Sequence, residues 1–297
     1  MLAFILRRIV QALVVMLAVA FIAFMLFQYV GDPVASMLGQ DATPEQRERL
    51  RADLGLDQPF VVQFAHFAGN AVRGDFGISL RQGRQVSALI AERLPATLEL
   101  SLAAAVIALA AGIPLGVYAA LRRGSFGSQV VMTLSLLGVS LPTFLIGILL
   151  ILVFAVMLKW LPSFGRGDTV AIGAWSTGLL TADGWKHLIL PAITLAVFQL
   201  ALILRLVRAE MLEVLRTDYI KFARARGLSD RAVHFGHALK NTLVPVITIA
   251  GLQLGAIIAF AFITETVFQW PGMGLLFIQA VQSAGIPIMA AYLCLIA

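Results

Sequence analysis

Long apolar runs without a single charged residue constrain this chain more than any other feature of its sequence. A bilayer core is about 30 Å thick, and a helix rising about 1.5 Å per residue crosses it in about 20 residues. Five runs of about that length contain no Asp, Glu, Lys or Arg: 9–30, 100–121, 130–158, 188–204 and 242–264. A sixth apolar run begins near Pro287 and continues to Ala297, so we expect an incomplete sixth helix. The sequence therefore predicts an all-α polytopic membrane protein with about six transmembrane helices.

Composition and charge agree with a lipid environment. The chain is 60% hydrophobic and 13% charged, whereas an ordinary soluble domain is about 45–50% apolar and about 25% charged. The net charge is +6, but the basic residues lie in the segments between the apolar runs. That placement favours topology-setting loops over a nucleic-acid surface. We therefore expect membrane lipid, and no nucleic acid, as a partner.

The distribution of Lys and Arg predicts the orientation in the membrane. With a cytoplasmic N-terminus, the inside segments are 1–8, 122–129 and 205–241. Together they hold 12 of the 22 Lys and Arg residues. The long segment 31–99 holds seven, but a segment of that length crosses the membrane whatever its charge. The remaining outside segments hold three, so we expect a multi-pass membrane protein with its N-terminus in the cytoplasm.

The run 9–30 follows the basic pair Arg7–Arg8 and is longer than the apolar region of a signal peptide, which has about 7–15 residues. We therefore expect an uncleaved helix. The predicted organisation has an N-terminal transmembrane helix at 1–30, an external (periplasmic) helical segment at 31–96 and a transmembrane core at 97–297. The cytoplasmic loop 205–241 belongs to that core.

Short helices are predicted in the external segment. Thr43 and Gln46 form a capping-box pattern, with Pro44 at the first helical position and Gly55 as the end signal. Further amphipathic helices are predicted at 60–72 and 86–94. No strand pattern of any length is evident.

Motifs of catalysis and metal binding are absent from the sequence. It contains no phosphate-binding G-x-x-x-x-G-K-[ST] loop, no H-E-x-x-H and no G-x-S-x-G. His234 and His237 share a helix face but lack a third ligand nearby, which favours a solvated surface over a metal site. We therefore expect no enzymatic activity, no cofactor and no metal.

Polar residues in or beside the spans are costly there and are frequently functional. Glu99 and Glu265 lie near the outer boundary, where solvation at the interface is the simpler interpretation. Gln199 and Gln253 lie deeper, and their amides need partners in other helices or a wet passage. Packing and a translocation pathway are equally good interpretations of these two residues.

No acidic residue at mid-depth is available for a proton relay, which disfavours a proton-driven transporter. A stand-alone secondary transporter or channel nevertheless remains open as a function.

The segment 208–241 carries the most specific pattern. It predicts two amphipathic helices joined at Gly227, with Gly227 in a left-handed conformation and Ser229 capping the second helix. Apolar residues such as Tyr219 and Leu228 are surrounded by Lys and Arg. Composition alone favours a basic helix on the inner leaflet over a helix that docks on a partner.

The residues of this loop nevertheless resemble the EAA loop of ATP-binding-cassette import permeases, in which an E-A-A pattern precedes a glycine. Ala223 and Gly227 match it. The version D-Y-x-x-x-A-R-A-R/K-G-L-S…H-A-L-R/K-N is similar to the dipeptide/oligopeptide/nickel permease branch. Other similar segments are Leu6-Arg7-Arg8, Gly31-Asp32-Pro33-Val34, Leu54-Gly55-Leu56-Asp57-Gln58-Pro59, Gly74-Asp75-Phe76-Gly77-Ile78-Ser79, Arg93-Leu94-Pro95-Ala96-Thr97 and Glu265-Thr266-Val267-Phe268-Gln269-Trp270-Pro271-Gly272.

This resemblance covers nearly the whole chain, and the short N-terminus and long outer segment resemble the first of two permease subunits. It implies the type I importer permease fold, a location in the bacterial inner (plasma) membrane and a heterodimer with a second permease subunit. It also implies two cytoplasmic ATP-binding subunits and an external solute-binding protein. The residues expected to couple to the ATPases are Asp218, Tyr219, Ala223, Ala225, Gly227 and Leu228. Dipeptides, oligopeptides, glutathione, opines and nickel complexes all remain open as solutes.

Overall fold

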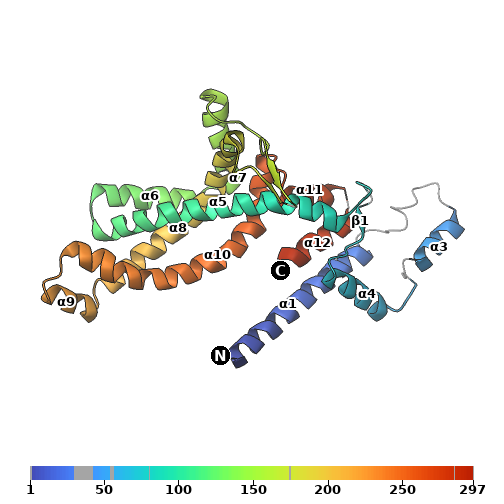
Figure 1. Cartoon of the computed structure of the whole chain (residues 1–297), viewed down its shortest axis with the longest axis horizontal. Helices are drawn as coiled ribbons and strands as arrows, with labels where there is room; N and C mark the ends of the chain where they lie inside the picture. Colours follow the sequence, from blue (N-terminus) through green and yellow to red (C-terminus); the bar gives the residue numbers. More distant parts are fainter. Residues whose placement is uncertain are drawn as a thin grey trace. The chain divides into compact units, whose positions relative to one another are not determined.

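The computed structural model describes residues 2–29, 43–53, 57–79, 81–173, 175–283 and 285–296. Its helices are α1 (Leu2–Tyr29), α3 (Pro44–Asp53), α4 (Phe60–Val72), α5 (Val86–Leu121), α6 (Phe126–Ser140), α7 (Thr143–Leu150), α8 (Ala182–Val214), α9 (Asp218–Ala225), α10 (Leu239–Val267), α11 (Met273–Gln282) and α12 (Ile286–Ile296). Two π-helical stretches, η1 (Ile151–Met157) and η2 (Ala232–Ala238), follow α7 and precede α10. The all-α class is therefore confirmed, and Figure 1 shows these elements.

In the part of the chain that the structure describes, four very short strands form that the sequence did not predict. β1 (Ile78–Ser79) pairs antiparallel with β2 (Arg84–Gln85), and β3 (Val170–Ile172) pairs antiparallel with β4 (Trp175–Thr177). Strands of two or three residues are too short to show an alternating pattern. The sequence therefore showed no strand pattern, and the strands that form are short local hairpins.

The chain divides into two compact units, Met1–Pro95 with Gly272–Ala297, and Ala96–Pro271. In the first unit, α1 packs on α12 and α4. Phe24 of α1 meets Phe60, Phe64 and Phe67 of α4, with ring centroids 5.3–5.7 Å apart. A separate apolar cluster in this unit joins the first turns of α5 to α11 and α12.

The predicted capping box at Thr43 and Gln46 is confirmed. The backbone N–H of Thr43 donates to Gln46 Oε1 at 3.0 Å, and the N–H of Gln46 donates to Thr43 Oγ1 at 3.3 Å. The helix at 60–72 forms as expected. Gly55 lies outside the described residues. The helix expected at 86–94 does form, but it is the beginning of α5, which continues through Pro95 to Leu121. A proline removes one helical hydrogen bond, yet its fixed φ is close to the helical value, so it can kink a helix without ending it.

The second unit holds the long helices. α8 packs against α6, α7 and α10. On α5 every fourth residue is buried, because positions four apart share a helix face. That face comprises Ala96, Leu100, Ala104, Ala108, Gly112 and Gly116. A Cβ at Gly116 would collide with Val207 and with the Leu204 carbonyl of α8, so small residues here permit close helix contact.

Within the described residues, four helices are long and apolar enough to cross a membrane: Ala3–Met25, Val86–Leu121, Ala182–Val214 and Ala232–Val267. They correspond to four of the five predicted spans. The fifth, at 130–158, is broken into Phe126–Ser140 and Thr143–Met157, which meet at 109°. Pro142 explains the break, because the residue before a proline is pushed out of the helical region and Leu141 is extended. The predicted kink is therefore a sharp bend. The short apolar helix α12 lies where the incomplete sixth span is expected.

Candidate functional site

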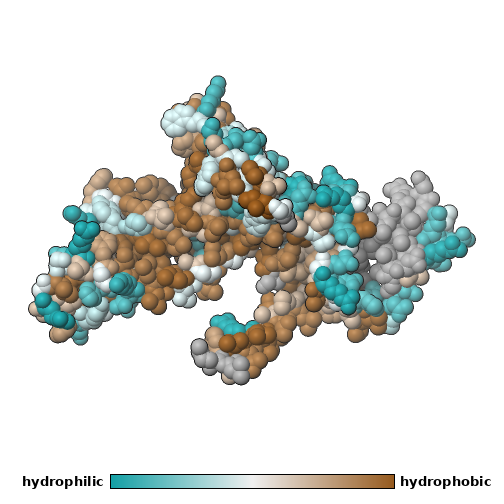
Figure 2. Space-filling view, viewed as in Figure 1, coloured by the Kyte–Doolittle hydropathy of each residue, from teal (hydrophilic) through white to brown (hydrophobic). Residues whose placement is uncertain are grey.

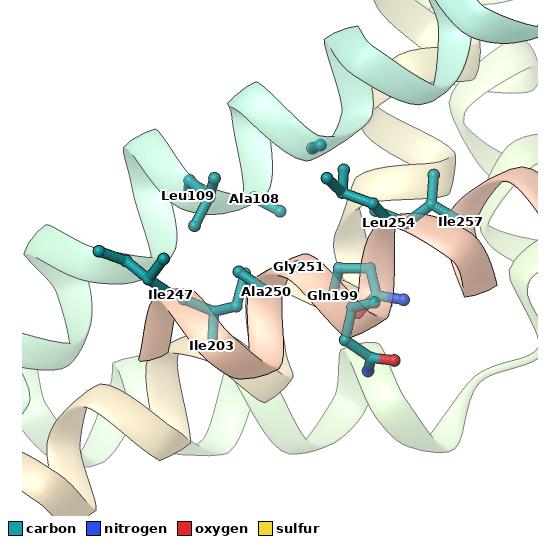
Figure 3. A pocket seen from close by; sticks show the side chains of 11 residues that line it. Ala108, Leu109, Gln199, Ile203, Ile247, Ala250, Gly251, Leu254 and Ile257 are labelled. Atoms are coloured by element: carbon teal, nitrogen blue, oxygen red, sulfur yellow. The ribbon is translucent and has the colours of Figure 1, made fainter. Parts of the chain in front are cut away.

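A groove in the second unit brings together the two glutamines that the sequence singled out. It lies between α5, α8 and α10 and has a volume of about 230 Å³. Figure 3 shows α5 on one side and α10 on the other, with Gln199 of α8 near one end. Its lining residues are Ala105, Ala108, Leu109, Gln199, Ile203, Ile247, Ala250, Gly251, Gln253, Leu254 and Ile257. Gln199 and Gln253 are its only polar side chains, so the groove has an apolar wall with two amides.

Gln199 is the more buried of the two amides. Its side chain is 6% exposed, and its Oε1 has no hydrogen-bond partner among the described residues. Gln253 is half-buried. A buried amide oxygen without a partner is costly in an apolar setting. Gln199 therefore has a buried acceptor that packing among the described residues leaves without a partner.

The loop between α8 and α10 differs from the two-helix prediction. α8 runs on to Val214, a turn follows at 215–217, and α9 begins at Asp218. The first predicted loop helix is thus two pieces. Thr217 followed by an acidic first-turn residue is an N-terminal signal that indicates this break.

Gly227 has the predicted left-handed conformation, with φ +79°. Its N–H donates to the Arg224 carbonyl at 2.9 Å, and the N–H of Leu228 donates to the Ala223 carbonyl at 3.4 Å. This pair of bonds is a Schellman motif, which closes the carbonyl end of a helix. Ser229 Oγ then accepts from the Ala232 N–H at 3.4 Å, so the second helix has its expected cap.

The six candidate loop residues do not lie on one surface. Asp218, Tyr219, Ala225, Gly227 and Leu228 are exposed, whereas Ala223 is 5% exposed and packs inside the loop beside buried Ile220. Tyr219 also holds the loop together, because its hydroxyl lies 2.7 Å from His237 Nδ1.

Two exposed aromatic residues of the loop 205–241 are absent from the six residues expected to couple to the ATPases. Phe222 is 65% exposed and Phe235 is 51% exposed. Phe222 follows Tyr219 by three residues, a spacing that places both on one helix face. Figure 2 shows hydrophilic and hydrophobic patches interleaved over α9 and a continuous hydrophobic surface along α10. The loop therefore presents apolar side chains among basic ones.

The acidic residues at the opposite end of these helices are not solvated, so that expectation is wrong. Glu99 is 5% exposed and Glu265 is fully buried. Glu99 pairs with Arg166 at 2.6 Å, and the Thr97 hydroxyl donates to Glu265 at 2.6 Å. A hydrogen-bonding partner for each carboxylate offsets part of the free-energy cost of burying it. Arg166 was not a candidate in the sequence analysis.

Among the described residues, no group of three or more His, Cys, Asp or Glu side chains is arranged to hold a metal ion. His237, one of the two loop histidines, contacts the hydroxyl of Tyr219 instead. The geometry thus consists of a groove, a loop surface and a buried polar network.

Two family profiles match the chain. Residues 112–297 match "Binding-protein-dependent transport system inner membrane component", and residues 1–102 match the N-terminal profile of the corresponding membrane components. A di/tripeptide transport system permease protein of Pseudomonas aeruginosa is 41% identical, covering 100% of this chain and 93% of that protein. A dipeptide transport system permease protein of Escherichia coli is 38% identical, with the same coverage. A putative peptide transport system permease protein of Brucella suis is 42% identical over 97% of this chain and 90% of the relative.

A solved structure of the MetNI methionine ABC transporter, in an inward-facing conformation, contains a similar fold. The TM-score is 0.53 at 18% identity, covering 70% of this chain and 88% of the matched chain. That likeness concerns the fold alone.

Proposed function

Because this chain belongs to the family of inner membrane components of binding-protein-dependent transport systems, we propose that it is the membrane-spanning permease subunit of an ATP-binding-cassette importer for short peptides. The observation that carries the proposal is the likeness to peptide permeases, at 38–42% identity over 97–100% of the chain. The family's dependence on a binding protein supports an external partner that delivers the solute.

The groove is the proposed wall of the translocation pathway. One subunit supplies only one side of a passage, so a second permease subunit completes it. Gln199 and Gln253 then face the solute. Each amide offers a carbonyl acceptor and an NH₂ donor, and a peptide group needs one of each. Two amides in an apolar groove suit a solute whose backbone is constant and whose side chains vary.

The groove also disfavours the stand-alone alternative. An ion-coupled transporter needs an ionisable or ion-coordinating residue along its path. None of the 11 residues that line the groove is ionisable. Energy therefore comes from outside the spans, and in this proposal two cytoplasmic ATPases supply it.

The loop 205–241 is the proposed contact with the ATPases and lies in the cytoplasm, as does the N-terminus. Tyr219 and Leu228 are 46% and 40% exposed, and the basic residues around them stay hydrated. Asp218, Ala225 and Gly227 lie on the same accessible loop. Ala223 acts indirectly, since it lies on the buried face of α9 and fixes how that helix packs on the loop core.

Reconstitution tests this function. The chain is purified with its second permease subunit and ATPases, placed in liposomes, and supplied with the binding protein and a labelled dipeptide. We expect uptake that needs ATP and the binding protein together. Omitting the second permease subunit is the matched control, and uptake should vanish with it. Uptake driven by an ion gradient without ATP contradicts the proposal.

A further inference from the structure

A buried ion pair joins two segments that are far apart in sequence. Arg166 Nη2 lies 2.6 Å from Glu99 Oε2, and the two side chains are 8% and 4% exposed. Glu99 is on α5, about 1.7 turns before Ala105 of the groove. Arg166 belongs to the hairpin segment, which we define as residues 159–173 and 175–181, carrying β3 and β4. The pair therefore ties the hairpin segment to a helix that lines the groove.

The guanidinium of Arg166 is held in one orientation. Nη2 also donates to the Ser176 carbonyl at 2.6 Å, and Nη1 donates to Ser176 Oγ at 3.1 Å. Its neighbours Gly165 and Gly167 both have left-handed φ, at +87° and +69°, which favours glycine. A Cβ on Gly167 would collide with Asp183 and His187 of α8. The backbone is therefore shaped to direct this one side chain inward.

The end of α10 joins the same network. The Gly165 N–H donates to the Phe268 carbonyl at 2.9 Å, and the Arg166 guanidinium lies 5.9 Å from the ring centre of Trp270. Trp270 Nε1 donates to the Ala96 carbonyl of α5 at 2.9 Å. The hairpin segment thus bridges the stretch of α5 from Ala96 to Glu99 and the end of α10. These two helices form two walls of the groove.

Stability alone does not account for a charged pair here. Replacing a buried ion pair with apolar side chains of similar size is commonly neutral or stabilising. Glu99 Oε1 and Arg166 Nε, moreover, are buried without hydrogen-bond partners among the described residues. What a guanidinium adds is geometric specificity, because its planar set of N–H donors binds acceptors in only one arrangement.

We propose that Glu99 and Arg166 are positioning residues that join the hairpin segment, the stretch of α5 from Ala96 to Glu99 and the end of α10 into one rigid body. The two groove walls then move together during transport and keep their spacing. This role rests on the proposed function, and it concerns neither the solute contact nor the loop 205–241.

The double variant Glu99→Met with Arg166→Met tests the proposal, because it leaves no uncompensated buried charge and should fold. The matched control is Arg84→Met with Glu92→Met, which removes an exposed pair of 3.0 Å in the other unit. In a Cys294→Ser background, spin labels at Ile172 and Leu102 report the distance from the hairpin segment to α5. Both positions are exposed. We expect a narrow distance distribution in wild type and the control, and a broad one in the double variant.

The second measurement is ATP hydrolysis by the reconstituted complex, with and without binding protein and peptide. In the double variant we expect the basal rate to persist while stimulation falls about five-fold or more, the lower range for coupling between sites. A distance distribution as narrow as wild type overturns the positioning role, whatever the ATPase shows. Full stimulation in the double variant, despite a broad distribution, overturns the link to transport. Absence of stimulation in wild type counts instead against the proposed function, and the distance measurement still decides the positioning role.

Discussion

The long helices of the second unit carry opposite kinds of side-chain arrangement at the hairpin segment and at the loop 205–241. At the hairpin segment the charged side chain turns inward, and Arg166 is 8% exposed with partners on two segments. At the loop 205–241 the aromatic side chains turn outward, and Phe222 is 65% exposed. A network that is bonded within itself makes a rigid end, whereas exposed apolar side chains leave free energy to be gained on contact with another protein. The difference suggests that one end holds the helices and the other end receives a partner.

The largest effect is expected from Gly227→Asp at the loop end. Gly227 has open space around its Cβ position, so the substitution costs backbone strain of about 1–2 kcal/mol and no internal collision. The added carboxylate stands on the surface proposed to meet the ATPase. We expect normal amounts of protein in the membrane, with both ATPase co-purification and peptide uptake abolished.

Gly124→Asp is the matched control for this experiment. Gly124 has φ +85°, open space around its Cβ position and a place in the turn 122–125, expected on the same side of the membrane. It should carry the same strain and retain ATPase binding. If Gly227→Asp recovers as much ATPase as Gly124→Asp, the loop is not the coupling element.

The next largest effect is expected from Arg166→Met alone at the hairpin end. The change leaves Glu99 buried without its cation, and breaking a buried pair in this way costs about 3–5 kcal/mol. We expect a markedly lower melting temperature in detergent and less protein in the membrane. Addition of Glu99→Met should restore most of the loss, since the stranded charge is then gone. A single variant that melts like wild type means that water already reaches Glu99.

The sequence predicted the structure of the loop end but not that of the hairpin end. The loop end is held by contacts between residues close in sequence, and the hairpin end by contacts between distant ones. The loop is local: Gly227, its Schellman bonds and Ser229 lie within a few residues, and capping patterns express such short-range bonds directly. The Glu99–Arg166 pair spans 67 residues, and no local pattern links its partners. Two glycines around a lone arginine form the sole local signal, since they mark a backbone that needs left-handed φ.

The helices show the same division. Runs without charge indicate which segments cross the bilayer, since each such segment must be apolar throughout. They do not indicate how far a helix extends beyond the membrane. The apolar runs therefore missed that α5 begins at Val86 and that α8 continues to Val214. Pro95 and Pro142 look equivalent in sequence, yet the helix continues through one and bends by 109° at the other. Packing against neighbouring helices decides such cases.

The smallest effect is expected from Lys221→Met, which sharpens the contrast with Arg166. Lys221 Nζ lies 2.8 Å from Asp218 Oδ1, nearly as close as the buried pair, but the side chains are 70% and 95% exposed. Water screens both charges, and an exposed pair three residues apart on a helix contributes about 0.5 kcal/mol or less. We therefore expect a melting temperature within error of wild type, and ATPase recovery close to it. A loss as large as that of Arg166→Met would show that burial is not what separates the two pairs. A selective loss of ATPase recovery, with unchanged melting, would instead place Lys221 in the docking surface and extend it beyond the apolar side chains.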